Sequence, residues 1–263
     1  MHEADARLQL RAVRTAAAPP GYVALAAGGI EGALLATLER HLRAALTSGS
    51  FFSYAEHHPA ARALAGRGVA YAVPLPDCVA TVVVRRSRHG GLLAPLTGDR
   101  FFGETRAPKE LEISLTLARR GVPTPEIVAY ATYPADPFRR RADVVTREVK
   151  RSRDLAAALG DPDPGARDEA LVATGKLVGL LTAAGARHPD LNLKNILLAP
   201  DVNGALEAFV LDVDRVWFDA PGSSRVTDAN LRRLARSAEK WRGRHGLAID
   251  AARILELATD RGS

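Results

Sequence analysis

The feature that most constrains the fold is a polar loop, followed by two short apolar runs and an acidic ending, between residues 188 and 214. Residues 188 to 195 run His-Pro-Asp-Leu-Asn-Leu-Lys-Asn. Apolar runs at 196–198 and 206–211 flank the turn Asp-Val-Asn-Gly, and the second run ends in Asp-Val-Asp at 212–214. Short apolar runs on either side of such a turn predict two strands. We therefore expect Asp190, Asn195 and Asp212 to converge on one site.

These three side chains suit phosphoryl transfer from ATP. One carboxylate orients the attacking hydroxyl and accepts its proton, while a second carboxylate and an amide oxygen hold Mg²⁺ on the phosphates. Mg²⁺ uses a few hard oxygen ligands and keeps waters, so Asn195 and Asp212 would suffice. Each element alone is more often a turn or a helix cap. The joint pattern, His-x-Asp-x-x-x-x-Asn, two strands and then Asp, matches the catalytic and metal-binding loops of kinases.

Three neighbouring side chains have alternative roles. Lys194 is a second catalytic candidate that would stabilise charge on the migrating phosphoryl group, and the alternative is a solvated surface lysine. Asp214 is either a second metal ligand or an anchor for Arg215. We predict that His188 orders the loop through a backbone hydrogen bond instead of transferring protons.

The rest of the chain divides into a strand-rich part and a helix-rich part. Strands are expected at 69–73, 79–84, 127–132 and 144–149, with a helix between Pro108 and Gly121. The spacing of apolar residues also predicts a helix over 30–46. Helices are expected at 155–159, 168–184, 228–241 and 249–257. The prediction is an α+β, bilobal protein-kinase-like fold: a loosely ordered lead-in over 1–28, a small antiparallel-sheet nucleotide-binding lobe over 29–148, and a larger helical catalytic lobe over 149–263.

Composition narrows the class of protein further. Hydrophobic residues are 47% and charged residues 25% of the 263, which is ordinary for a globular protein with a core. The single cysteine, Cys78, excludes an internal disulfide and a cysteine metal cage, and we expect it only to pack. No apolar run approaches the ~18 to 20 residues of a membrane span, and the N-terminus lacks the layout of a secretion signal.

The net charge of +6 attracts polyanions, and arginines cluster at 85–88, 139–141 and 232–233. The alternative to a binding role for this charge is that the Arg- and Ala-rich composition reflects a GC-rich genome. Aromatic residues are only 5%, so stacking platforms for single-stranded nucleic acid are scarce. We expect no nucleic-acid partner, and the alternative of a nucleic-acid binder rests on charge alone.

Several further segments share one family's pattern. They are Gly66-Arg67-Gly68, Val83 to Leu92, Thr105-Arg106 before a helix that contains Glu110, Gly121 to Pro125, Asp190 to Leu198, Leu211 to Arg215, and Asn230 to Ser237. The sequence from about residue 66 to 240 resembles the lipopolysaccharide kinases, and most of all the 3-deoxy-D-manno-octulosonic acid (Kdo) kinases. The Asp190–Asn195 and Asp212 motifs are typical of the wider kinase-like fold, whereas the arginine-glycine strand, the Gly-Val-Pro-x-Pro turn and the tail point to this family.

The resemblance implies roles by position. Asp190 would be the catalytic base, with Asn195 and Asp212 as Mg²⁺ ligands. The nucleotide would be held by Gly66, Arg67 and Gly68 over the phosphates, by Arg85 in place of the usual strand lysine, by Glu110 or Glu112 as its partner, and by the backbone around Glu148 at the adenine. Two alternatives stay open. A lone Gly-x-Gly is often a turn and not a nucleotide site. Arg85 presents a planar fork where lysine is a point charge, so its phosphate contact differs in geometry, or its side chain only extends its charge from the strand to solvent.

The resemblance also implies a function. We expect an Mg-ATP-dependent kinase that phosphorylates a sugar hydroxyl of the lipopolysaccharide inner core, namely the 4-hydroxyl of Kdo in a Kdo-lipid A precursor. Alternative acceptors are a core heptose, another small molecule or a protein, and a non-catalytic kinase-like scaffold is a different class. We expect a cytoplasmic monomer that binds its anionic glycolipid substrate peripherally on the cytoplasmic face of the inner membrane. Each cation near an anionic membrane surface adds about 1 kcal/mol to the binding free energy.

Overall fold

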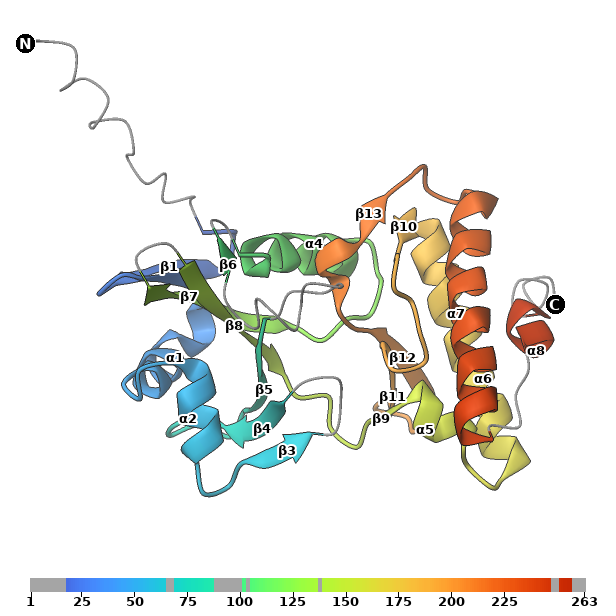
Figure 1. Ribbon diagram of the computed structural model, residues 1–263, viewed down its shortest axis with the longest axis horizontal. Coiled ribbons are helices and arrows are strands. Elements are labelled where there is room, and N and C mark those ends of the chain that lie inside the picture. The colour runs from blue at the N-terminus through green and yellow to red at the C-terminus, as the bar shows by residue number, and fades with distance from the viewer. Residues whose placement is uncertain are drawn as a thin grey trace, which may run out of the picture.

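The computed structural model describes residues 18–64, 69–87, 101–102, 105–136, 139–246 and 251–256. They form two lobes that lie side by side in Figure 1. A large antiparallel sheet organises the first lobe, and helices dominate the second, as predicted. None of the helices in these ranges is long and apolar enough to cross a bilayer.

The sheet of the first lobe has the strand order β1-β2-β7-β8-β5-β4-β3, with β6 also paired to β8. Its strands are β1 (Tyr22–Ala27), β2 (Ile30–Leu35), β3 (Arg62–Leu64), β4 (Ala70–Pro74), β5 (Thr81–Arg86), β6 (Phe101–Phe102), β7 (Ile127–Asp136) and β8 (Arg139–Arg147). Four of the predicted strands are confirmed as β4, β5, β7 and β8. The central strands are rich in valine, whose branched side chain packs well on a pleated surface.

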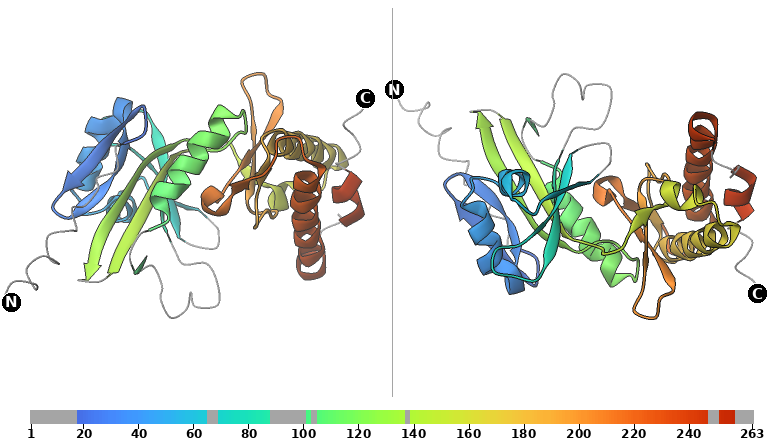
Figure 2. Two further views of the ribbon diagram at one scale, coloured as in Figure 1. Left: turned by 90° about the horizontal axis from the view of Figure 1, so that it is seen from above. Right: turned by 90° about the horizontal axis from the view of Figure 1, so that it is seen from below.

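Helices cover both faces of this sheet (Figure 2). One face packs against α1 (Glu39–Leu46) and α2 (Phe51–His57), which follow a short 3₁₀ turn, η1 (Ala36–Leu38). The other face packs against α4 (Ala107–Arg119), the helix predicted after Pro108. Helix α4 also contacts η2 (Val213–Arg215) of the second lobe. It therefore lies between the sheet and the predicted metal-binding loop.

The N-terminal part of the lobe differs from the prediction. Residues Ile30–Leu35 are a strand, not the start of a helix, and Tyr22–Ala27 are strand β1, not a loosely ordered lead-in. Gly28 and Gly29 connect these strands with φ of 57° and 82°. Two glycines with positive φ form the two-residue turn that antiparallel strands favour. The spacing of apolar residues over 30–35 fits a helix as well as a strand. The Gly28-Gly29 turn selects the strand, because it pairs this segment with the one before it.

The second lobe packs its helices around one core. Its helices are α5 (Leu155–Leu159), α6 (Pro164–Ala183), α7 (Ser224–His245) and α8 (Ala251–Glu256). Its short strands are β9 (Arg153–Asp154), β11 (Ile196–Pro200) and β12 (Leu206–Val210), which form one sheet, and β10 (Ala186–Arg187) with β13 (Trp217–Phe218), which form another. The predicted hairpin at 196–211 is β11–β12, and the predicted helices are present.

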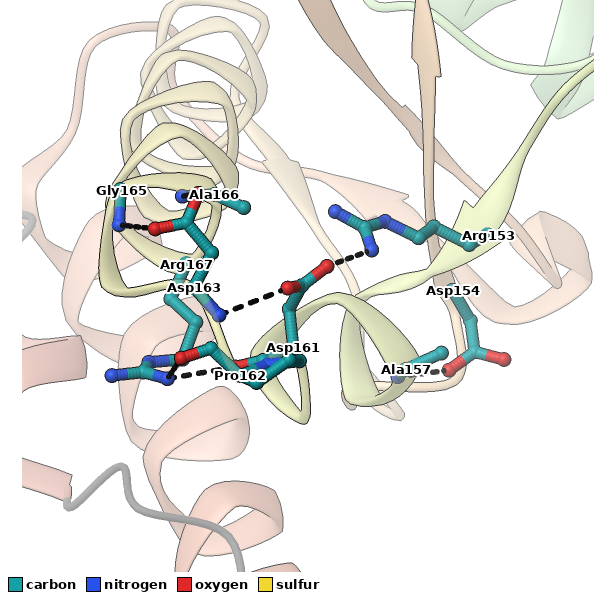
Figure 3. Close-up of polar contacts among 9 residues, drawn as sticks. All are labelled: Arg153, Asp154, Ala157, Asp161, Pro162, Asp163, Gly165, Ala166 and Arg167. Carbon is teal, nitrogen blue, oxygen red and sulfur yellow. Dashed lines mark hydrogen bonds and ion pairs between the residues drawn. The ribbon is translucent and has the colours of Figure 1, made fainter.

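Acidic side chains fix the entry into this lobe (Figure 3). The Asp154 carboxylate accepts a hydrogen bond from Ala157 N at 3.0 Å and so caps α5. The Asp163 carboxylate caps α6 in the same way, and Arg153 binds Asp161 between the two helices at 2.6 Å. Such caps satisfy amide groups that a helix leaves unpaired in its first turn.

Candidate active site

The loop between β10 and β11 is held in shape by its own asparagines. Asn192 Nδ2 and Asn195 Nδ2 both donate to the Asp190 carbonyl at 2.9 Å, and Lys194 N donates to Asn192 Oδ1 at 2.9 Å. Asn192 and Asn195 are each 7% exposed, whereas Asp190 is exposed. The buried amides therefore hold the loop around Asp190, which is itself exposed. Asparagine side chains are suited to this because they bond locally to the backbone.

His188 cross-links the two predicted loops. Its ring is 2% exposed, Nδ1 accepts a hydrogen bond from Asp190 N at 3.2 Å, and Nε2 lies 2.9 Å from the Leu211 carbonyl. An accepting Nδ1 and a donating Nε2 require the neutral imidazole. Burial lowers the pKa of His188 below its ordinary value, which favours the same form. The structural role predicted for His188 agrees with these contacts.

Asp212 emerges from β12 in a left-handed conformation, with φ 55° and ψ 51°. Aspartate tolerates this region better than most residues, but it is still strained. The residue before it, Leu211, donates its N–H to the Asn195 carbonyl at 2.9 Å. The side chain of Asp212 is 57% exposed. The hairpin thus places Asp212 beside the loop of Asp190 and Asn195.

An arginine from the first lobe reaches this loop. Arg85 on β5 forms an ion pair with Glu110 on α4, and its Nη2 lies 3.9 Å from Asp212 Oδ1. The structure settles the open choice of partner: Glu110 is buried and paired, whereas Glu112 is exposed. Burial raises the pKa of the Glu110 carboxyl, and the Arg85 charge opposes that shift. Arg85 therefore does not extend to solvent alone but joins both lobes.

The alternation of β5 explains why Arg85 and its neighbour differ. Arg85 pairs in register with Val144, which packs on the α4 face, and Arg86 pairs with Asp143 on the opposite face. Arg86 lies with its guanidinium carbon 4.0 Å above the Phe52 ring of α2 and its Nε 3.8 Å from Asp143. Successive strand residues point to opposite faces. Only one of the two arginines can therefore serve the site.

Asp214 binds a second arginine of the first lobe. Its Oδ2 lies 3.2 Å from Arg106 Nη1, and Arg106 is the N-cap residue of α4. The two alternatives predicted for Asp214 were a metal ligand and an anchor for Arg215. The observed partner is Arg106, which the sequence reading missed, although Thr105-Arg106 stands out as a family motif.

Lys194 binds an acidic partner that sequence reasoning also missed. Its Nζ lies 2.5 Å from Asp154 Oδ2, and the same carboxylate caps α5. Nζ also lies 5.8 Å from the centre of the Trp241 ring on α7. Lys194 is therefore ion-paired, not simply solvated, and its role on the migrating phosphoryl group stays a prediction. A lysine beside a capping aspartate of the preceding strand leaves no local pattern in the sequence.

The remaining nucleotide-binding predictions have different outcomes. Gly66, Arg67 and Gly68 lie outside the described residues, between β3 and β4. The N–H groups of Arg147 and Glu148 donate to the carbonyls of Glu126 and Thr81 at 2.7 and 3.0 Å, and the Glu148 carboxylate pairs with Arg62. These contacts occupy the N–H groups of Arg147 and Glu148, and the role of the backbone around Glu148 at the adenine stays a prediction.

The donor set fits a magnesium nucleotide. Asn195 donates through its amide nitrogen to the loop, so its oxygen is the atom that would bind a metal ion, and Asp212 presents an exposed carboxylate. Both are hard oxygen donors of the kind that Mg²⁺ accepts together with phosphate and water. The described residues contain no cluster of three or more His, Cys, Asp or Glu side chains that could hold a metal ion.

Comparison with known proteins identifies relatives over most of the chain. The model of the lipopolysaccharide kinase (Kdo/WaaP) family matches residues 55–252. The 3-deoxy-D-manno-octulosonic acid kinase of Xanthomonas oryzae pv. oryzae (strain PXO99A) is 34% identical over 207 residues, covering 75% of this chain and 79% of that protein. The enzyme of the same name from Stenotrophomonas maltophilia (strain K279a) is 31% identical over 216 residues, with the same coverage.

A solved structure shows the same fold. The structure of WaaP in complex with acyl carrier protein superimposes with a TM-score of 0.53 and 21% identity, covering 88% of this chain and 89% of that one. The kinase-like fold predicted from sequence is therefore confirmed.

Proposed function

Because the chain belongs to the lipopolysaccharide kinase (Kdo/WaaP) family, we propose that it transfers a phosphoryl group from ATP to the 4-hydroxyl of Kdo in a lipopolysaccharide precursor. The supporting observation is the cross-linked pair of loops that presents Asp190 and Asp212 beside Asn195. Phosphoryl transfer needs this combination of base and metal ligands. The choice of Kdo follows the names of the relatives that are 34% and 31% identical.

We assign Asp190 as the group that orients the Kdo hydroxyl and accepts its proton. Its carboxylate is exposed while its backbone is fixed on both sides, by Asn195 and by His188. A base held in one position avoids the cost of ordering it during the reaction. His188 stays neutral and does not compete for the proton.

We assign Asn195 and Asp212 as the ligands that would hold Mg²⁺. The ion would neutralise charge on the phosphate oxygens. Arg85 would bind the phosphates from the other lobe, with Glu110 keeping its guanidinium in place. The glycines at 66–68 would cover the phosphates between β3 and β4.

We assign Lys194 as an anchor of the catalytic loop. Its ion pair with Asp154 joins the loop to β9 and to the first turn of α5. The segment near residue 148 leads into that strand, so we place the boundary of the two lobes between residues 148 and 149.

The test of activity uses the purified protein, Mg-ATP and Kdo-lipid A precursor. We expect a phosphorylated glycolipid, no product with Asp190→Asn, and no product when Mg²⁺ is chelated. Phosphorylation of a core heptose acceptor but not of Kdo would reject the Kdo assignment and keep the kinase. Absence of turnover with every acceptor, in a protein that still binds ATP, would reject the kinase and support a scaffold.

We further propose that the protein meets its glycolipid as a peripheral membrane protein, through the exposed basic side chains of α7. Seven Lys and Arg side chains of this helix are exposed, against two acidic ones. By contrast, Arg85 and Arg86 of the predicted clusters bind partners within the fold: Glu110 and Asp212 for Arg85, and Phe52 for Arg86. The basic residues of α7 are Arg225, Arg232, Arg233, Arg236, Lys240, Arg242 and Arg244.

Flotation with anionic vesicles tests this surface. We expect Arg232→Glu with Arg236→Glu to weaken binding about tenfold or more at low salt, since each cation contributes about 1 kcal/mol. The matched control is Arg40→Glu with Arg43→Glu on α1, where both arginines are also exposed. Equal loss in both double variants would show that only net charge matters, and no vesicle binding by the unaltered protein would reject the proposal.

A further inference from the structure

The segment from Asn230 to Ser237 stands out in the sequence, but the proposed chemistry does not use it. It forms the central part of α7. Asn230 is fully buried, and its side chain makes two hydrogen bonds to the chain that leads into the catalytic loop. Its Oδ1 accepts from His188 N at 3.0 Å, and its Nδ2 donates to the Ala186 carbonyl at 3.0 Å.

Two helical turns further on, a second side chain reaches the same loop. Ser237 Oγ accepts a hydrogen bond from Leu193 N at 3.2 Å. One more turn along the helix, the Trp241 ring lies under Lys194. Residues seven and eleven positions apart share one helix face. One face of α7 therefore follows the catalytic loop from its start to its end.

These contacts replace secondary structure that the loop lacks. The backbone N–H of Leu193 belongs to a fully buried residue, and a buried donor without a partner is costly. Asn230 and Ser237 supply acceptors two residues before Asp190 and three residues after it. The position of the base is therefore fixed on both sides by a helix that is remote in sequence.

We propose that Asn230 and Ser237 are positioning residues that hold the catalytic loop, so that Asp190 is set at a fixed place before substrate binds. Neither side chain touches a reactant. This inference rests on the proposed kinase function for its effect on rate, but not for its effect on the loop itself.

The same helix offers a matched control. Thr227 Oγ1 lies 2.8 Å from Thr182 Oγ1 of α6, and both side chains are buried. This bond also fastens α7 to the lobe, but it does not touch the catalytic loop. A role in general stability should be shared by Thr227 and Ser237, whereas a role in positioning should belong to Ser237 alone.

The first experiment compares Ser237→Ala with Thr227→Val. We expect both to lower the unfolding midpoint to a similar extent. Only Ser237→Ala should lower kcat, by about tenfold, with KM for ATP and for the acceptor within about twofold, because a misplaced base slows the chemical step. Ser237→Thr keeps the hydroxyl and should restore most of kcat. Equal kcat in the alanine and valine variants would overturn the proposal.

The second experiment does not need activity. Amide hydrogen exchange of the peptide that covers residues 186–195 should accelerate in Ser237→Ala and in Asn230→Asp, but not in Thr227→Val. Asn230→Asp keeps the acceptor for His188 and removes the donor to Ala186, so it tests the site if Asn230→Ala does not fold. Unchanged exchange in both variants would reject the positioning role. Faster exchange in a protein without kinase activity would reject only the proposed function.

Discussion

The two sides of the candidate site are held together by different forces. On the side of the first lobe, Arg85 and Arg106 make ion pairs with Glu110 and with the aspartates at 212 and 214. On the side of the second lobe, neutral side chains form buried or partly buried hydrogen bonds to the backbone: the asparagines at 192, 195 and 230, with His188 and Ser237.

This difference indicates which side of the candidate site is formed before a ligand binds. The pairs with Asp212 and Asp214 are partly exposed, so they are weak and screened by salt, and a phosphate group can replace either carboxylate as the partner of the arginine. A phosphate group does not replace the neutral side chains that bond to the backbone, and breaking one of these hydrogen bonds leaves an unpaired group. We infer that the base and metal-ligand side is preorganised, while the arginine side adjusts when a charged ligand enters.

The largest expected effect breaks the charged side. In Arg85→Gln, the buried Glu110 carboxyl loses the charge that opposes its raised pKa, and the phosphates lose their cation. We expect kcat/KM to fall about 100-fold, a change of about 2.7 kcal/mol, with KM for ATP raised. Arg85→Lys should recover only part, because lysine lacks the planar fork. The matched control is Arg43→Gln, whose exposed pair with Glu39 lies on α1. An Arg85→Gln enzyme with unaltered KM and kcat would contradict the assignment.

The next prediction tests the one ion pair on the preorganised side. If Lys194 anchors the loop through Asp154, then Lys194→Met and Asp154→Asn should each lower kcat about tenfold, and the double variant should be little worse than either. A much larger loss in Lys194→Met than in Asp154→Asn would mean that the ammonium group acts on the phosphoryl group. Steady-state kinetics of the three variants decides between these outcomes.

A third prediction concerns pH. Burial lowers the pKa of His188 below 6.5, so above that pH the ring is neutral in both folded and unfolded chains and its hydrogen bonds are intact. Below pH 6.5 the unfolded chain binds the proton more readily, so stability falls as the pH falls toward the folded pKa. Urea unfolding at pH 7.5 and 5.5 should show a smaller difference in His188→Gln. Identical pH dependence in both proteins would remove His188 as its source.

The smallest expected effect sharpens the comparison between the two sides. The Arg106–Asp214 pair is partly exposed, so a double-mutant cycle with Arg106→Gln and Asp214→Asn should give a coupling of about 0.5 kcal/mol in stability. At high salt the coupling should vanish. The Thr182–Thr227 pair, analysed in the same way, should keep its coupling, since it is buried and neutral. Salt-independent coupling between Arg106 and Asp214 would place that pair on the preorganised side.

The sequence by itself determined the local parts of this protein. The Asn-Gly turn and its apolar flanks specify the β11–β12 hairpin, and the period of two along β5 sends Arg85 and Arg86 to opposite faces. The residue types at 190, 195 and 212, two carboxylates and an amide, define which chemistry is available, whatever the fold. The Gly28-Gly29 pair is also a turn signal in the sequence, but the leucine spacing after it predicted a helix where Ile30–Leu35 form a strand.

The tertiary structure decided which distant groups meet. Glu110 and Glu112 lie on one helix, and only the packing of α4 buries the first and exposes the second. Arg106 pairs with Asp214, which is 108 positions away in the sequence, and Asn230 bonds to His188, which is 42 positions away. Local propensity repeats over a few residues, so it leaves a pattern that can be read. A contact between remote segments depends on how whole elements pack, and no short stretch of sequence records it.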